Sequence, residues 1–297
     1  MFKEYPEFGQ ADEFRKMSTN AYQLNDIAQT ARRLVDLLAG LKSVAVAWSG
    51  GVDSAVVAKA AVLALKDQAV AVTAVSPSLA ESERRVAQSE AVAIGIRHVE
   101  ISTQEFVREE YRRNAGDRCF YCKDTLYTLM SDRMKKLGVD VLVNGANTDD
   151  LGDYRPGMTA AEQHGVRSPL IELGINKAGV RRLAHHWELN VADKPASPCL
   201  SSRIAYGVEV TESRVRQVEL AEVCVRELTG LQEIRVRCEA GDLARIEVPV
   251  TELTQLVHSD VRTELVSRLT ELGFTNVTLD LQGFRSGSLN AALVQLK

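Results

Sequence analysis

The segment that most constrains the fold is a six-residue loop at 49–54, with the sequence SGGVDS. It follows the apolar run Ser43–Trp48, which is typical of a buried central strand, and it precedes a helical pattern over Ala55–Leu65. Two adjacent glycines allow positive φ angles and leave the backbone N–H groups unshielded, while the following helix adds its positive N-terminal end. A strand, loop and helix in this order form a concave site that suits a pyrophosphate group.

The side chains of this loop fit the same chemistry. The hydroxyls of Ser49 and Ser54 add hydrogen-bond donors, and the carboxylate of Asp53 can reach a Mg²⁺ ion that bridges phosphate oxygens. The sequence lacks the Gly-x-x-x-x-Gly-Lys-Ser/Thr pattern of the Walker loop. An ordinary glycine turn is the alternative, but the flanking strand and helix favour phosphate binding. The residues predicted to bind phosphate are Ser49, Gly50, Gly51, Asp53 and Ser54.

Strands and helices alternate along the first part of the chain, which indicates an α/β fold with a doubly wound parallel sheet. A helical pattern begins at Asn25, before the loop. After the loop, strand and helix patterns follow each other at the spacing of βαβ units. The expected elements in chain order are a strand at 69–75, a helix at 81–94, a strand at 97–101, a helix at 123–137 and a strand at 139–143.

The pattern changes after an irregular stretch at 192–207. A helix, a strand hairpin, a second helix and a strand then follow, an order typical of an α+β unit. We therefore predict an N-terminal extension over 1–22, a parallel α/β domain over 23–206 and a smaller α+β domain over 207–297.

Composition excludes several classes of protein. The 297 residues carry 36 Lys and Arg against 40 Asp and Glu, a net charge of −4, so there is no global basic charge for nucleic acid or a membrane surface. Five cysteines are too few, and odd in number, for a secreted disulfide scaffold. No apolar run approaches the length of a membrane span, and the polar N-terminus lacks a signal-peptide core. We expect a cytoplasmic protein with no membrane or nucleic-acid partner.

Three of the cysteines lie in segments that suggest metal or redox chemistry. Cys119 and Cys122 form a Cys-x-x-Cys pair at the start of a helix, and Cys199 lies in the irregular stretch. The pair could be a redox dithiol or half of a zinc site. The histidines available as a further zinc ligand are His164, His185 and His186. Three thiolates without an obvious fourth instead suggest a 4Fe-4S cluster with one open iron, while Cys224 and Cys238 fit packing positions.

Several segments resemble known families. The loop at 49–54 is similar to the signature of the PP-loop ATP pyrophosphatases. That resemblance implies a Rossmann-like fold of the adenine nucleotide alpha hydrolase type and cleavage of ATP between its α and β phosphates. Three further segments resemble the LarE family more specifically. They are Asn144–Gly157, the loop around Cys199 and Leu281–Gly287.

The resemblance to the LarE family implies a reaction. Its members are ATP-dependent sulfurtransferases that act on pyridinium-3,5-biscarboxylic acid mononucleotide, the precursor of the nickel-pincer nucleotide cofactor of lactate racemase. With ATP and Mg²⁺, a carboxylate becomes an acyl-adenylate, and sulfur then displaces AMP to give a thiocarboxylate. The implied partners are this pyridinium mononucleotide, a sulfur donor system and other proteins of nickel-pincer cofactor biosynthesis, and we expect a homo-oligomer.

The LarE family has two versions. In one, a single cysteine before the second domain gives up its own sulfur and becomes dehydroalanine. In the other, three cysteines hold a 4Fe-4S cluster. Cys119, Cys122 and Cys199 resemble the cluster version, so they are the implied catalytic and cluster-binding residues. Cys199 as a stoichiometric sulfur donor remains the alternative.

The implied substrate carries two carboxylates and a phosphate, so it needs fixed cations. Arg235 and Arg237 alternate with apolar residues on a predicted strand and therefore share one face, with Glu247 projecting outward on the next strand to orient them. The alternative is a solvated strand face with weak ion pairs. The expected substrate-binding residues are Ser202, Arg203, Arg235, Arg237, Glu247 and Arg285. Further candidates for nucleotide, Mg²⁺ or substrate are Asp149, Asp150 and Asp153.

Two rival functions stay open at this point. A tRNA thiolation enzyme shares the PP-loop and a three-cysteine cluster, although the acidic balance and the lack of a lysine-rich domain disfavour it. A regulatory ATP-binding module with structural zinc would release no pyrophosphate with any acid substrate.

Overall fold

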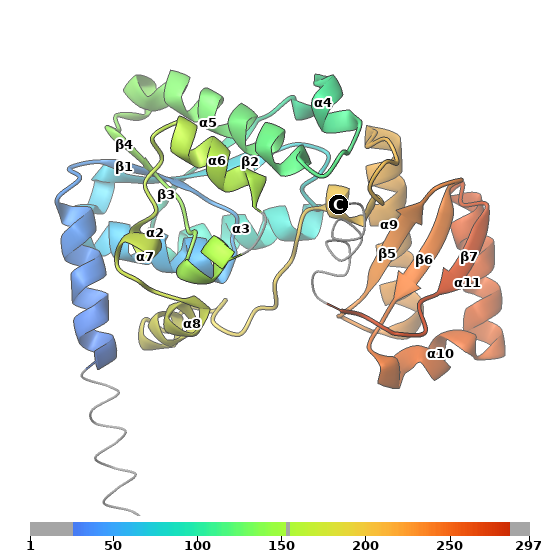
Figure 1. Cartoon of the computed structure of the whole chain (residues 1–297). Helices are drawn as coiled ribbons and strands as arrows, with labels where there is room; N and C mark the ends of the chain where they lie inside the picture. Colours follow the sequence, from blue (N-terminus) through green and yellow to red (C-terminus); the bar gives the residue numbers. More distant parts are fainter. Residues whose placement is uncertain (1–25, 153–154, 286–297) are drawn as a thin grey trace, which may run out of the picture.

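The computed structural model describes residues 26–152 and 155–285 (Figure 1). A helix over 26–39 leads into a four-stranded parallel sheet with the strand order β3-β2-β1-β4. The strands are β1 (Val44–Ala47), β2 (Ala69–Val75), β3 (Arg97–Ser102) and β4 (Val141–Val143). The connections between the first three strands are α2 (Val52–Leu65), η1 (Lys66–Gln68) and α3 (Glu81–Ile94). The predicted parallel α/β fold is confirmed.

The rest of this first unit is mostly helical. Helix α5 begins at Arg118, so the Cys-x-x-Cys pair lies at the start of a helix as expected, although the helical pattern was placed only from Lys123. The pattern starts late because the buried apolar positions of α5 begin only at Leu126. The remaining elements are η2 (Glu105–Val107), α4 (Glu109–Arg112), α5 (Arg118–Leu137), η3 (Thr148–Gly152), α6 (Pro156–Gln163), α7 (Pro169–Glu172), α8 (Lys177–His186) and η4 (Leu200–Arg203).

Helices cover both faces of the parallel sheet, which explains why its central strands are almost wholly apolar. Along β1, Val44 and Val46 pack in the layer that contains α2, α3 and α8, whereas Ala45 and Ala47 pack with α5 and α6. Both layers are therefore anchored on the strand that leads into the loop at 49–54.

The second unit is a three-stranded mixed sheet with the order β5-β6-β7, which confirms the predicted α+β unit. β5 (Arg235–Glu239) is antiparallel to β6 (Leu243–Glu247), and β6 is parallel to β7 (Asn276–Leu279). Its helical elements are α9 (Glu212–Thr229), η5 (Val250–Glu252), α10 (Leu253–Val257) and α11 (Ser259–Glu271). Cys224 and Cys238 are buried in its apolar core.

The core of the second unit extends across the predicted domain boundary. It takes in Phe106 and Tyr111 from the first unit, together with Leu200 and Ile204 just before the boundary. The boundary at residue 206 stays a prediction, and the predicted N-terminal extension lies outside the described residues. Within residues 26–152 and 155–285, no helix combines the length and apolar character needed to cross a membrane.

Candidate active site

The predicted phosphate-binding loop lies between β1 and α2 and packs directly against α3. Gly50 has a φ of +67°, and a Cβ atom there would lie 2.8 Å from the Cα of Ala87. The indole Nε1 of Trp48 donates to the carbonyl oxygen of Ala87 at 2.9 Å, which holds α3 against the loop. Position 50 therefore requires glycine, because any side chain meets both backbone strain and a backbone clash.

The two serines of the loop bond to each other and to its backbone. Ser49 Oγ lies 3.2 Å from Ser54 Oγ and accepts from the Gly51 N–H at 3.3 Å. Ser54 Oγ donates to the Gly51 carbonyl oxygen at 3.0 Å. The loop is thereby closed at the N-terminus of α2, where backbone N–H groups and the helix dipole favour an anion.

Asp53 lies between two partners that the sequence analysis did not identify. Its Oδ2 accepts from Lys177 Nζ at 2.6 Å, and its Oδ1 accepts from Asn147 Nδ2 at 3.1 Å. Lys177 is the first residue of α8, and Asn147 follows β4. Asn147 lies within the segment that resembles the LarE family, whereas Lys177 has no local signal beyond its place at the start of a helix. The carboxylate of Asp53 and the ammonium of Lys177 thus lie together at the N-terminus of α2.

The segment after β4 packs against the start of α2. A Cβ atom on Gly145 would lie 2.7 Å from the backbone nitrogen of Ser54. Asp149 Oδ2 accepts from the backbone N–H of Lys177 at 3.2 Å, and Asp150 Oδ1 pairs with Arg155 at 2.7 Å. These acids hold the turn in shape in this structure, and their predicted role in ligand binding stays a prediction. Asp153 lies outside the described residues.

Lys194 connects the phosphate loop to the irregular stretch that contains Cys199. Its Nζ lies 2.7 Å from Glu83 Oε2 and 3.5 Å from the carbonyl oxygen of Gly50. Arg181 of α8 donates to the carbonyl oxygen of Lys194 at 3.3 Å. The chain leading to Cys199 is therefore fixed against the loop.

Arg203 holds the backbone around Cys199. Its side chain is buried, and its Nε donates to Glu222 Oε1 at 2.9 Å. Its Nη1 donates to the carbonyl oxygens of Pro198 and Cys199, and Ser202 Oγ donates to the same Cys199 oxygen at 2.6 Å. The substrate contact predicted for Arg203 and Ser202 stays a prediction, since in this structure Ser202 bonds within the loop and Arg203 bonds to the loop and to Glu222.

The three cysteines are gathered from α5 and from the loop before η4. Cys119 and Cys199 are exposed, and Cys122 is half-buried. Desolvation by the surrounding protein, followed by the negative field of Glu105, raises the pKa of Cys122 to about 12. Desolvation and the nearby Cys199 also raise the pKa of Cys119. Both shifts favour the protonated form of the thiol over the thiolate.

No three His, Cys, Asp or Glu side chains in the described ranges are arranged to hold one metal ion. The thiol donors themselves suit an iron-sulfur cluster, in which each cysteine binds a different iron and the sulfur atoms lie further apart than around a single ion. The charge of Cys199 contributes to the raised pKa of both Cys119 and Cys122, so Cys199 lies near the pair. The three thiols suit the ligands of an iron-sulfur cluster, and a 4Fe-4S cluster at this site stays a prediction.

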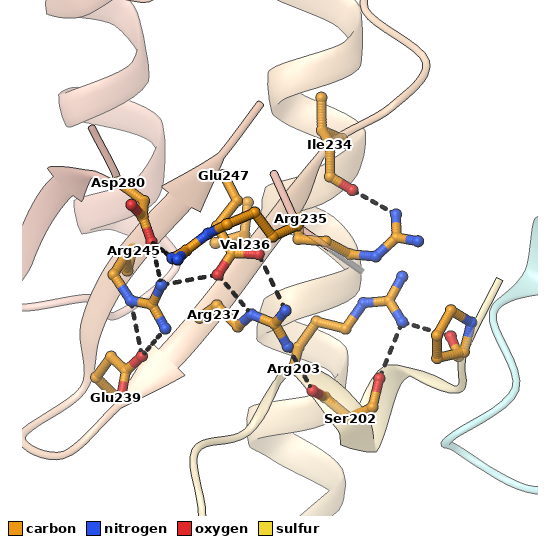
Figure 2. A network of polar contacts seen from close by, with 12 residues as sticks. Ser202, Arg203, Ile234, Arg235, Val236, Arg237, Glu239, Arg245, Glu247 and Asp280 are labelled. Carbon is orange, nitrogen blue, oxygen red and sulfur yellow. Dashed lines mark hydrogen bonds and ion pairs between the residues drawn. The ribbon is translucent and has the colours of Figure 1, made fainter. Parts of the chain in front are cut away.

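Figure 2 shows a polar network on β5 and β6 beside the Cys199 loop. Arg237 donates through Nε and Nη2 to both oxygens of Glu247, at 3.0 and 2.9 Å, and Arg245 donates to Glu247 Oε1 at 2.7 Å. The expectation that Glu247 orients an arginine agrees with these contacts. The expected outward projection of Glu247 is wrong, and so is the alternative of a solvated face at Arg237, because Glu247 is 0% exposed and Arg237 is 6% exposed. The Cys199 loop covers this face, and the Ser202 carbonyl oxygen accepts from Arg237 Nη1 at 2.8 Å.

Arg235 differs from Arg237 and Arg245, which bond to the Glu247 carboxylate. Among the described residues, its guanidinium bonds only to backbone carbonyl groups. Its Nη1 donates to the Ile234 oxygen at 2.6 Å and its Nη2 to the Ala196 oxygen at 3.3 Å, and its guanidinium lies 5.0 Å from the centre of the Phe284 ring. Burial, and then the positive charge of Arg203, lower the pKa of Arg235 to about 10. It remains charged at neutral pH and suits an anion. Arg285, the last candidate, pairs with Asp280 at 3.5 Å.

The parallel sheet and the glycine loop at the start of α2 define a domain of the PP-loop class. A family model described as NAD synthase matches residues 24–120, a range that includes this loop. Pyridinium-3,5-bisthiocarboxylic acid mononucleotide synthase of Lactiplantibacillus plantarum is 36% identical over 272 residues, 91% of this chain and 96% of the relative. The chain belongs to the family of that synthase, the LarE family.

Two relatives without an assigned function match over similar lengths. An uncharacterized protein of Synechocystis is 45% identical over 250 residues, 84% of this chain and 92% of the relative. An uncharacterized protein of Methanocaldococcus jannaschii is 26% identical over 245 residues, 82% of this chain and 92% of the relative. The similarity thus spans both units of the chain in each case.

Proposed function

We propose that this protein is an ATP-dependent sulfurtransferase that converts the carboxylates of pyridinium-3,5-biscarboxylic acid mononucleotide into thiocarboxylates for nickel-pincer nucleotide biosynthesis. The observation that carries the proposal is that Lys194 links the loop at 49–54 to the cysteine site. Its side chain contacts the Gly50 carbonyl oxygen, and its backbone lies in the stretch that leads to Cys199. The name of the L. plantarum relative supports the same reaction.

In the first step, ATP binds with its phosphates on the loop at 49–54 and Mg²⁺ is held partly by Asp53. A substrate carboxylate oxygen attacks the α-phosphorus, the bond to the β-phosphate breaks, and pyrophosphate leaves. The loop N–H groups, the helix dipole of α2 and the ammonium of Lys177 stabilise the negative charge that collects on the leaving phosphates. Adenylation is needed because a carboxylate oxygen is a poor leaving group.

In the second step, sulfur at the cysteine site forms a bond to the acyl carbon, and the bond to AMP breaks. We propose that Cys119, Cys122 and Cys199 ligate a 4Fe-4S cluster, which when bound supplies an open iron for sulfur. The chain's own contribution is to present three thiols in one region and to fix the Cys199 backbone through Arg203. A second round treats the other carboxylate.

The arginines near the Cys199 loop support an anionic substrate. Arg235 carries its charge without a carboxylate partner among the described residues, so it can hold the phosphate or a carboxylate of the mononucleotide. Arg237, Glu247 and Arg203 fix the surrounding strands and loop. The further partners in this proposal are a sulfur donor system and other proteins of nickel-pincer biosynthesis, and the working form is a homo-oligomer.

The test is mass spectrometry of the pyridinium substrate after incubation with ATP, Mg²⁺ and anaerobically reconstituted protein. The expected result is exchange of oxygen for sulfur, with release of pyrophosphate and AMP. Cys224→Ala, which changes a buried cysteine of the second core, is the matched control for Cys199→Ala, which should abolish exchange but not pyrophosphate release. No pyrophosphate release with this acid would contradict the proposal, and salt-sensitive tRNA binding would favour a tRNA thiolation enzyme instead.

A further inference from the structure

Arg118 is a buried cation beside the cysteines with no role in the mechanism above. It is the first residue of α5 and directly precedes Cys119. Only 5% of its surface is exposed. Its Nη1 donates to Oδ1 of Asn114, a neutral amide.

Asn114 fixes the position of that guanidinium. Asn114 is 0% exposed, has a φ of +55°, and donates through Nδ2 to the carbonyl oxygens of Ala205 at 2.8 Å and Val208 at 3.1 Å. Its own carbonyl oxygen accepts from the Gly207 N–H at 3.1 Å. The amide thus ties Arg118 to the chain that joins the two units.

The charge of Arg118 has no counter-ion in the part of the chain that the structure describes. The bond to Asn114 is the only protein hydrogen bond of its guanidinium there, and no carboxylate of the described residues lies within ion-pair distance. Among the described residues, the guanidinium nitrogen atoms of Arg118 that lack a protein partner are not fully sealed from solvent. A buried cation without an anion is costly, which favours binding of an anion from solution.

The surroundings of Arg118 identify where such an anion would lie. The hydroxyl of Tyr111 lies 2.8 Å from Ser201 Oγ, two residues after Cys199. Burial is the main cause that raises the pKa of Tyr111, and the charges of Cys199, Cys122 and Arg118 act on the same phenol. Arg118 is therefore in the same region as the cysteine site, on a different element from Arg235 of β5.

We propose that Arg118 binds a carboxylate of the substrate beside the cysteines. This inference rests on the proposed function, in which the substrate is an aromatic dicarboxylate and only one carboxylate is adenylated in each round. The other carboxylate stays anionic and planar, and the planar fork of a guanidinium matches it with two hydrogen bonds. Holding that group turns the activated carbonyl carbon towards the cysteines and makes the site selective for diacids over monoacids.

The test measures binding to the full-length protein by calorimetry, with pyridine-3,5-dicarboxylate and pyridine-3-carboxylate as probes. We expect the wild-type protein to bind the diacid about tenfold or more tightly than the monoacid, as charged hydrogen bonds allow. Arg118→Gln should bind both acids with the same affinity. Arg113→Gln is the matched control, because Arg113 is a mostly exposed arginine near the same helix start, paired with Asp117, and should keep the wild-type preference.

Equal binding of the two acids by the wild-type protein, or a preference that Arg118→Gln retains, would overturn the inference. If Arg118→Gln does not fold, the same two affinities are measured for Arg118→Lys, which keeps the positive charge but lacks the planar guanidinium. A reduced preference is then expected, and an unchanged preference counts against the assignment. Thiocarboxylate formation is measured separately, so loss of the proposed function and loss of diacid selectivity are distinguishable.

Discussion

The ammonium Nζ of Lys177 lies 2.6 Å from Oδ2 of Asp53, although the two residues are 124 positions apart in the chain. The contact joins the first turn of α8 to the first turn of α2, at the loop that we expect to bind the phosphates of ATP. A carboxylate suited to Mg²⁺ and a cation suited to phosphate are therefore paired with each other.

The first prediction concerns Lys177. Lys177→Met should lower the kcat/KM for pyrophosphate release by about a hundredfold, because the charge developing on the leaving phosphates loses a fixed cation. The measurement is a coupled pyrophosphate assay with the pyridinium substrate. Lys136→Met, at an exposed lysine in the last turn of α5, should leave the rate unchanged. Equal rates in the wild-type and Lys177→Met proteins would remove Lys177 from the site.

The second prediction concerns the close packing of Gly145 on α2. Gly145→Ala places a Cβ atom 2.7 Å from the Ser54 nitrogen, so the loop must shift, at a cost of about 1–3 kcal/mol in the free energy of unfolding. ATP affinity should fall with it, as measured by calorimetry beside urea unfolding. Gly152→Ala is the control, since nothing lies within 4 Å of a Cβ atom there. If both variants bind ATP as the wild type does, the packing at Gly145 does not shape the loop.

The third prediction concerns the buried Glu247. Glu247→Gln removes the fully buried carboxylate charge that pairs with both Arg237 and Arg245, so it should reduce the free energy of unfolding by about 3–5 kcal/mol. Glu264→Gln, which breaks an exposed pair with Arg268, should cost about 0.5 kcal/mol or less. Urea unfolding of the three proteins provides the comparison. Similar losses in the two variants would mean that Glu247 has no special structural role.

The fourth prediction concerns acid stability at Asp124. Its oxygens accept from Arg108 Nη1 at 2.6 Å and His164 Nε2 at 2.8 Å, and these hydrogen bonds, that of Arg108 first, lower its pKa below the ordinary 3.8. The pKa is lower in the folded state than in the unfolded state. The stabilisation is therefore complete above the ordinary pKa and is lost as the pH falls through the folded pKa.

As the pH falls below about 4, the Asp124→Asn protein should therefore lose less stability than the wild type does. Thermal unfolding at a series of pH values measures this slope. Asp132→Asn, at an exposed position on the same helix, is the control and should keep the wild-type slope. An identical acid slope in Asp124→Asn and wild type would mean that Asp124 does not titrate differently on folding.

Some features could be predicted from the sequence because they depend on residues close together in the chain. The apolar run before the loop at 49–54 predicted a strand buried on both faces, and β1 is fully buried. Helix α3 and strand β2 have the predicted bounds, since their periodicity is unbroken. The helical pattern of α5 was placed only from Lys123, because its first turns lie at the junction of the two units, where burial does not follow one helical face.

The sequence by itself determined the parallel sheet, the glycine loop between β1 and α2, and the alternation that places Arg235 and Arg237 on one side of a strand. Only the tertiary structure decided that Arg237 and Glu247 are buried, that Arg203 supports the Cys199 backbone, and that Lys177 meets Asp53. Periodicity reports which face of an element is apolar, whereas the partner of a charged side chain depends on which distant element packs against that face. Here the packing of α8 on α2, and of the Cys199 loop on β5, supplied those partners.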